Sequence, residues 1–193
     1  MKLVNAICCL AAVLLPGPVT AAESTEQTAA QATIAAFAGA LKAELTTAMQ
    51  AGGPLNAIEV CNARAPAIAA AVSLEQGMSV SRVSLRNRNP ENAPNEWQSA
   101  VLQEFETRRA AGENPEALSW QEWADTDGGQ EFRFMKAIPT APLCLACHGE
   151  ALAAPVADRI DELYPADKAT GFREGDIRGA FVVTKPVEQT IPE

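Results

Sequence analysis

The sequence Cys144-Leu145-Ala146-Cys147-His148 constrains this 193-residue chain more than any other feature. It contains two cysteines separated by two residues, and the chain's only histidine directly follows the second of them. Haem c is attached to proteins through this arrangement. Two thiols one helical turn apart can form thioether bonds with the two vinyl groups of one porphyrin, and the adjacent imidazole can bind its iron. The motif therefore predicts one covalently attached haem c, with Cys144 and Cys147 as attachment residues and His148 as the proximal iron ligand.

The N-terminal residues have the pattern of a secretory signal peptide. Lys2 precedes an apolar stretch from Val4 to Leu15, and small residues at positions 20–22 offer a cleavage site. The apolar stretch is too short to span a bilayer stably, so we expect no stable membrane anchor. We predict that residues 1–22 are removed on export to the periplasm, where bacterial c-type haems are attached. Residues 23–193 then form a single haem-binding domain, with its core at about 28–185.

Cleavage removes Cys8 and Cys9, and it leaves Cys61, Cys144 and Cys147 in the mature protein. These residues allow two alternatives to haem, in which the histidine would be an ordinary surface residue. Cys144 and Cys147 could close a small disulfide loop, or they could form half of a zinc site, although a structural zinc ion needs about four ligands. If they do attach haem, Cys61 is a lone thiol in an oxidising compartment.

The composition narrows the function classes. The formal charge of −9 argues against nucleic acid or an anionic membrane surface as a partner, and the 48% hydrophobic content supports a folded core. The sequence contains no P-loop and no dinucleotide-binding fingerprint. A Ser-His-Asp arrangement is excluded once the only histidine binds iron. We therefore expect a protein that is not an enzyme.

The pattern of apolar residues predicts a mixture of helices and strands. Apolar residues recur at helical spacing over residues 28–50 and again from residue 55, on either side of Gly52-Gly53-Pro54. Further helices are expected at residues 96–109 and 155–163. The predicted strands cover residues 80–85, 119–124, 131–138 and 177–184, and the turn Asp125–Gly129 joins the middle two as a hairpin. Four or five hairpin-connected strands with helices predict the α+β class with an antiparallel sheet.

The residues alone leave the sixth iron ligand open. Cys61 lies on the apolar stripe of the second helix, beside a kink or break predicted before Pro66. A thiolate would favour ferric iron and lower the reduction potential, whereas methionine opposite histidine raises it, as in electron carriers. The competing thioethers are those of Met49, Met78 and Met135. Each of these, like a buried free cysteine, is more commonly part of an apolar core, and a vacant or water-bound position is a further alternative.

Three arginines, Arg82, Arg86 and Arg88, form a basic cluster in an otherwise acidic chain. Arginine matches a carboxylate with paired donors, so we expect contacts with the haem propionates. The alternative is a polar strand face whose arginines make surface ion pairs. Further along the chain, Tyr164–Asp167 is expected to form a turn that closes the haem pocket.

Four stretches of the sequence, taken in order, resemble the Tll0287-like family of c-type haem proteins. They are Ala57–Cys61, Arg82–Pro94, Cys144–Gly149, and Tyr164–Asp167 with Gly171 and Gly175–Ala180. Together they span about residues 55–184, which is nearly all of the mature chain. The segment Lys136–Thr140, just before the haem motif, is looser than the family pattern.

The resemblance implies a PAS-like α+β fold, with long N-terminal helices and an antiparallel sheet of about five strands flanked by helices. It also implies that His148 and Cys61 are the two axial ligands of the iron. A Cys61 thiolate would be protonated and leave the iron after reduction, which would open a site for CO or NO. We therefore expect an exported monohaem protein that senses redox state or a diatomic gas. The signal would pass to a redox or signalling partner that the sequence does not identify.

Two other functions stay open. The first is a periplasmic electron-transfer cytochrome, which suits a chain without a recognisable output domain. The second is a haem-free module that uses its cysteines for metal or redox chemistry.

Overall fold

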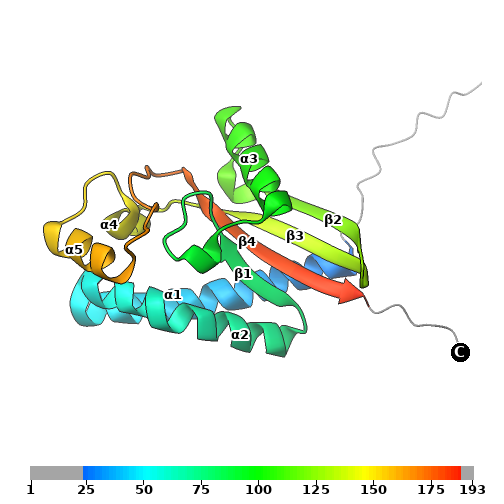
Figure 1. The fold of residues 1–193 in the computed structure, drawn as a ribbon, viewed down its shortest axis with the longest axis horizontal. Helices are drawn as coiled ribbons and strands as arrows, with labels where there is room; N and C mark the ends of the chain where they lie inside the picture. Colours follow the sequence, from blue (N-terminus) through cyan, green and yellow to red (C-terminus); the bar gives the residue numbers. More distant parts are fainter. Residues whose placement is uncertain (1–23, 188–193) are drawn as a thin grey trace, which may run out of the picture.

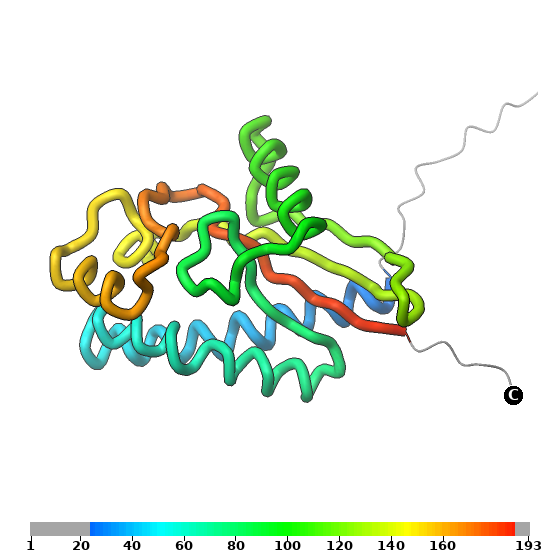
Figure 2. Tube along the Cα trace, viewed as in Figure 1, coloured from blue at the N-terminus to red at the C-terminus, as the bar shows by residue number. Residues whose placement is uncertain are grey.

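Two helical segments that fold back on each other form the first part of the computed structural model, which describes residues 24–187 (Figure 1). Within α1 (Thr25–Glu59), Gly52 and Gly53 have non-helical dihedral angles, and the φ of 70° at Gly53 is one that glycine adopts readily. The chain reverses at these residues, so the next helices run back alongside the first part of α1 (Figure 2). The predicted signal peptide lies outside the described residues.

The segment that connects α1 to the next helix is a π-helix. A π-helix (Val60–Arg64) follows α1 and leads into α2 (Ala65–Gln76). The first N–H of α2 donates to the carbonyl oxygen of Val60, five residues earlier. Pro66 has no N–H, so regular α-helical hydrogen bonding cannot run through this turn. The irregularity predicted before Pro66 is therefore a π-helix, and it carries Cys61.

The helical stretch Thr25–Gln76 is long and apolar enough, by length and composition, to be a candidate membrane span. In the structure this stretch is not one straight helix, because it reverses at Gly52 and Gly53. Buried side chains on α1, such as Ile34 and Phe37, pack in a core shared with the sheet.

A four-stranded antiparallel sheet has the strand order β1-β4-β3-β2. Its strands are β1 (Ser79–Val83), β2 (Ser119–Thr126), β3 (Gly129–Pro139) and β4 (Ile177–Val187). All four predicted strands are present, β2 and β3 form the predicted hairpin, and the α+β class is confirmed. The pairing of β1 with β4 places Val83 opposite Ala180. It thereby brings the loop after β1 close to the segment that enters β4.

The resemblance implied about five strands, and this number is wrong for the described part of the chain, which has four. After β1 the chain forms a loop with a short 3₁₀-helix, η2 (Pro90–Asn92). The side chain of Asn89 caps η2 by accepting a hydrogen bond from the N–H of Glu91 at 3.0 Å. Pro90 and Pro94 lack the N–H groups that a strand in a sheet would use. These residues favour the loop over a further strand.

Helices cover both faces of the sheet (Figure 1). On one face α1 and α2 pack in a core that contains Phe37 and Phe134. On the other face, α3 (Glu96–Ala110) contributes Phe105 to a second core with Met135. Phe134 and Met135 are neighbours on β3, and their side chains point to opposite faces because strand side chains alternate.

The C-terminal helices lie beyond one end of the sheet, next to the C-terminal end of α1 (Figure 1). The shorter helices after α3 are η3 (Pro115–Ala117), η4 (Pro142–Cys144), α4 (Leu145–His148) and α5 (Ala154–Leu163). Val156 and Ile160 of α5 pack in one cluster with Ile58 of α1. This contact brings the C-x-x-C-H motif and the π-helix to the same end of the molecule.

Candidate functional site

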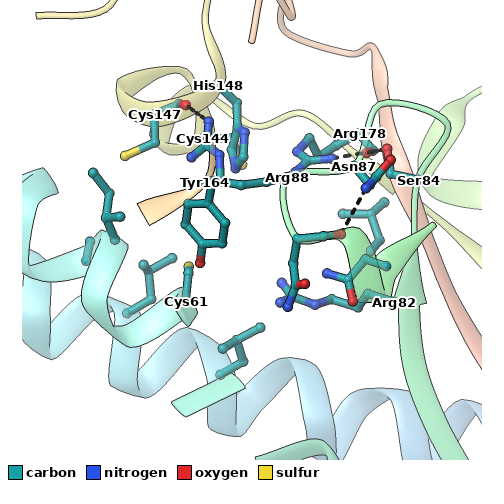
Figure 3. Close-up of a pocket in the computed structure, with 18 of the residues that line it drawn as sticks. Cys61, Arg82, Ser84, Asn87, Arg88, Cys144, Cys147, His148, Tyr164 and Arg178 are labelled. Carbon is teal, nitrogen blue, oxygen red and sulfur yellow. Dashed lines mark hydrogen bonds between the residues drawn. The ribbon is translucent and has the colours of Figure 1, made fainter. Parts of the chain in front are cut away.

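A cavity of about 210 Å³ lies at this end of the sheet, between α1, the C-terminal helices and the loop after β1. It is lined by the three described cysteines, all free thiols, and by the only histidine: Cys61, Cys144, Cys147 and His148 (Figure 3). Other polar side chains around it are those of Arg82, Ser84, Asn87, Arg88, Asn89, Asn92, Tyr164 and Arg178. Its apolar wall includes Leu41, Leu45, Met49, Ile58, Ile138 and Leu143. Of the predicted site residues, Arg86 alone is not in the lining.

The local sequence of the motif fixes its helical turn. Pro142 opens η4, where its missing N–H costs no hydrogen bond. Cys144 and Cys147 lie one turn apart, and α4 ends at the histidine. A Cβ at Gly149 would lie 2.6 Å from the carbonyl oxygen of Leu145, so a glycine is required where the chain leaves the helix.

His148 is held in one tautomer by a backbone carbonyl. Its Nδ1 lies 2.7 Å from the carbonyl oxygen of Ala169. Because a carbonyl only accepts, Nδ1 carries the proton and Nε2 keeps the lone pair that binds a metal. Burial lowers the pKa of His148 well below its usual value, and the charges of Arg178 and Arg88 lower it further. The ring is therefore neutral near pH 7, as an iron ligand must be.

Cys61 reaches the cavity from the π-helix, on an element far in sequence from the motif (Figure 3). Burial raises the pKa of the Cys147 thiol, the charge of Arg88 partly offsets this rise, and Cys61 raises that pKa further. The thiol of Cys61 therefore lies close enough to Cys147 to act on it electrostatically.

The structure separates the three competing methionines. Met78 is buried in the core between the helices and the sheet, and Met135 is buried in the core beneath α3. Met49 lines the cavity. Among the methionines, Met49 is therefore the one placed to compete with Cys61.

Two of the arginines predicted to contact the propionates also have partners within the protein. Arg88 is buried, forms an ion pair with Asp167 and donates to the carbonyl oxygen of Cys147. Arg86 is exposed, and its guanidinium carbon lies 4.1 Å from the centre of the Phe172 ring. The pairs that these two arginines make were not visible from sequence, because their partners lie far along the chain.

Arg82 and Arg178 have no carboxylate partner among residues 24–187. Arg178 donates through Nη1 to Ser84 Oγ at 3.2 Å, whereas its buried Nε has no hydrogen-bond partner in the described structure. Burial lowers the pKa of Arg178 to about 10, and the charges of Arg88 and Arg82 act in the same direction. Arg178 still carries its charge near pH 7, so this side of the cavity is positive and suits an anionic group.

The sequence interpretation did not select Arg178 as a site residue. It belongs to the Gly175–Ala180 stretch that carries the resemblance, so a signal was present. Its place at the cavity depends on the pairing of β4 with β1, which brings it beside Ser84.

The predicted turn at Tyr164–Asp167 is present. The N–H of Asp167 donates to the carbonyl oxygen of Tyr164 at 2.9 Å, and the Tyr164 ring lines the cavity beside Cys61 (Figure 3). Burial raises the pKa of its phenol, so the hydroxyl stays protonated near pH 7.

Comparison with known proteins identifies related chains. The family model described as Tll0287-like matches residues 19–186, a range that includes all residues lining the cavity. The crystal structure of the cyanobacterial heme-protein Tll0287 matches with a TM-score of 0.60 and 25% sequence identity, over 87% of this chain and 100% of that chain. This match confirms the fold expected from the resemblance. No match was found among curated proteins.

Proposed function

The chain belongs to the Tll0287-like family, and from this premise we propose that it is an exported protein that binds one haem c. The observation that carries the proposal is that the only histidine and all three described thiols line a single cavity. Cys144 and Cys147 would form the thioether bonds, and His148 would bind the iron through Nε2.

The cavity residues fit this cofactor. Haem needs an apolar surface for its ring, donors for its carboxylates and a neutral imidazole for its iron. Apolar side chains such as Leu41 and Ile138 supply the first, and the neutral His148 supplies the last. For the propionates we propose Arg82 and Arg178, because neither has a carboxylate partner within the described residues. Arg86 and Arg88, which the sequence analysis grouped with Arg82 as possible propionate contacts, have partners within the protein.

For the sixth iron ligand we propose Cys61. Bound haem supplies a redox-active iron that can also take a diatomic molecule at a free axial position. A thiolate opposite His148 would favour the ferric state and would be protonated and released more easily after reduction. The proposed function is therefore sensing of redox state or of CO or NO, without enzymatic activity, with the signal passed to a protein partner in the periplasm.

A second candidate is electron transfer. Leu143 lines the cavity next to the attachment motif and is 48% exposed, so the cavity reaches the surface there. An electron-transfer partner could approach the cofactor closely at this point. The reduction potential and the response to CO distinguish the two candidates.

The test is to produce the protein together with the haem-attachment machinery and to record its mass and its ferric and ferrous spectra with and without CO. We expect the mass of one added haem and a ferric thiolate band that Cys61→Ala removes. Met49→Ala, from the same cavity, is the matched control and should keep the band. Colourless protein of unmodified mass would refute haem attachment.

The same spectra decide between the candidates. Rapid CO binding by ferrous protein with a low midpoint potential supports sensing. A high potential with no CO binding supports electron transfer.

A further inference from the structure

The guanidinium of Arg88 joins the haem-attachment helix to the segment just after the Tyr164 turn. Its Nη2 donates to the carbonyl oxygen of Cys147 at 2.6 Å (Figure 3), and its Nε donates to Asp167 Oδ1 at 3.1 Å. The two side chains are only 9% and 8% exposed. Removal of one partner from a buried ion pair strongly destabilises a protein, because the other charge is left uncompensated.

Both members of the pair also bind the backbone of Ala169, the residue whose carbonyl oxygen orients the histidine. Arg88 Nη2 lies 3.3 Å from the carbonyl oxygen of Ala169, the same oxygen that accepts from His148 Nδ1 at 2.7 Å. Asp167 Oδ1 accepts from the N–H of Ala169 at 2.9 Å. Ala169 is fully buried. Ala169, whose carbonyl oxygen accepts from the imidazole, is therefore fixed at its N–H by a carboxylate and at its carbonyl oxygen by a guanidinium.

We propose that Arg88 and Asp167 are positioning residues that orient His148 through Ala169 and set the reduction potential of the iron it binds. The proposal rests on the proposed haem function and deepens it. Neither residue is placed as an iron ligand or propionate contact; they act through the carbonyl groups of Cys147 and Ala169. The hydrogen bond at the second nitrogen of a ligating histidine fixes the ring and tunes its donor strength.

The two charges should act in opposite directions. Removal of the Arg88 charge makes the carbonyl oxygen of Ala169 a better acceptor from His148. The imidazole then becomes a stronger donor to the iron, which favours the ferric state. Removal of the Asp167 charge leaves the guanidinium uncompensated and favours ferrous iron. Asparagine has nearly the shape of aspartate and can still accept from Ala169, so Asp167→Asn changes mainly the charge. Lysine keeps the charge of Arg88 but not its planar fork of donors.

The test compares midpoint potentials of haem-loaded wild type, Arg88→Gln and Asp167→Asn. We expect Arg88→Gln to lower the potential and Asp167→Asn to raise it. Each change should shift the one-electron equilibrium about tenfold, or about 59 mV. The matched control is the pair Arg173–Glu150, in which Glu150 lies just after the motif but the side chains are 75% and 56% exposed. Arg173→Gln and Glu150→Gln should leave the potential unchanged.

A second measurement reports on orientation rather than charge. Since His148 is the only histidine, ¹⁵N-histidine labelling gives one ring N–H signal in the haem-loaded protein. Arg88→Lys should keep a potential close to that of wild type but increase the exchange of this proton with solvent several-fold. This variant and Asp167→Asn together test the positioning role even if Arg88→Gln does not fold.

Shifts of the potential in the same direction in both charge variants, or unchanged ring-proton exchange in Arg88→Lys, would overturn the positioning role. Either result would reduce the pair to a purely structural contact. Wild-type protein without haem would refute the proposed function itself, and that result is seen before any variant is compared.

Discussion

Arg178 is the residue whose surroundings most clearly require a partner that the described chain does not supply. Its Nε is buried without a hydrogen bond, and Arg82 lies close enough to lower its pKa. Two neighbouring cations in one cavity repel each other, and a buried charge is costly unless it is paired. A bound carboxylate relieves both problems, which makes Arg178 a sensitive probe of the cavity's occupant.

We predict that Arg178→Gln destabilises the haem-loaded protein by about 1.5–3 kcal/mol, the usual contribution of a hydrogen bond to a charged group. Urea unfolding followed by circular dichroism measures the change. Arg86→Gln is the control, because Arg86 lies outside the cavity lining and is exposed. An equal loss in the two variants would argue against a propionate contact at Arg178.

For individual residues, the sequence predicted groupings of residues that are close in the chain but not contacts between residues that are far apart in it. Cys144, Cys147 and His148 lie within one short stretch of the chain, so their spacing alone predicted that they act together. Arg88 was predicted to contact a haem propionate, and its ion pair with Asp167 was not predicted. Asp167 lies 79 residues away, and their pairing depends on how the loop after β1 packs against the turn at Tyr164.

At the scale of elements, the π-helix decides where Cys61 points. A π turn holds one more residue than an α turn, so it rotates the helix before it relative to the helix after it. Periodicity and turn residues were enough to predict the strands, the hairpin and the helices, because these depend on local patterns. The π-helix was expected only as an irregularity near Pro66. Its form depends on how α1 and α2 pack, which no local pattern encodes.

We predict that deletion of Ala63, an exposed residue of the π-helix, restores α-helical spacing and turns Cys61 away by about 100°, the rotation per α-helical residue. The haem should stay attached, but the ferric thiolate band should be lost. Ala63→Ser leaves the chain length unchanged and should keep the band, as seen by absorbance spectroscopy. Retention of the band after deletion would mean that the turn does not orient Cys61.

At the scale of the whole molecule, pH should act on stability through the single histidine. The pKa of His148 is depressed in the folded protein by burial, whereas in the unfolded chain it is about 6.5. As pH falls below about 6.5, the unfolded state takes up a proton that the folded state refuses, so the free energy of unfolding decreases. The direction is the same with iron bound, because a ligating nitrogen cannot hold a proton.

The measurement is urea unfolding of the haem-loaded protein between pH 5 and about 7.5. Wild type should lose stability toward the acid end, and His148→Gln, which cannot titrate there, should lose less. Burial raises the pKa of Glu106, so that group opposes the trend in both proteins and cancels in the comparison. Parallel pH profiles of the two proteins would contradict the prediction.

The two axial candidates lie far apart in the sequence, Cys61 in the π-helix after α1 and His148 in the short helix between β3 and β4. An iron atom held by both would act as a cross-link between these two parts of the chain and close a long loop. Such a link restricts the unfolded chain, much as a disulfide does. Loss of the iron–sulfur bond on reduction would remove this cross-link, so a change of one electron at the metal would become a change in mechanical coupling between the two parts of the chain.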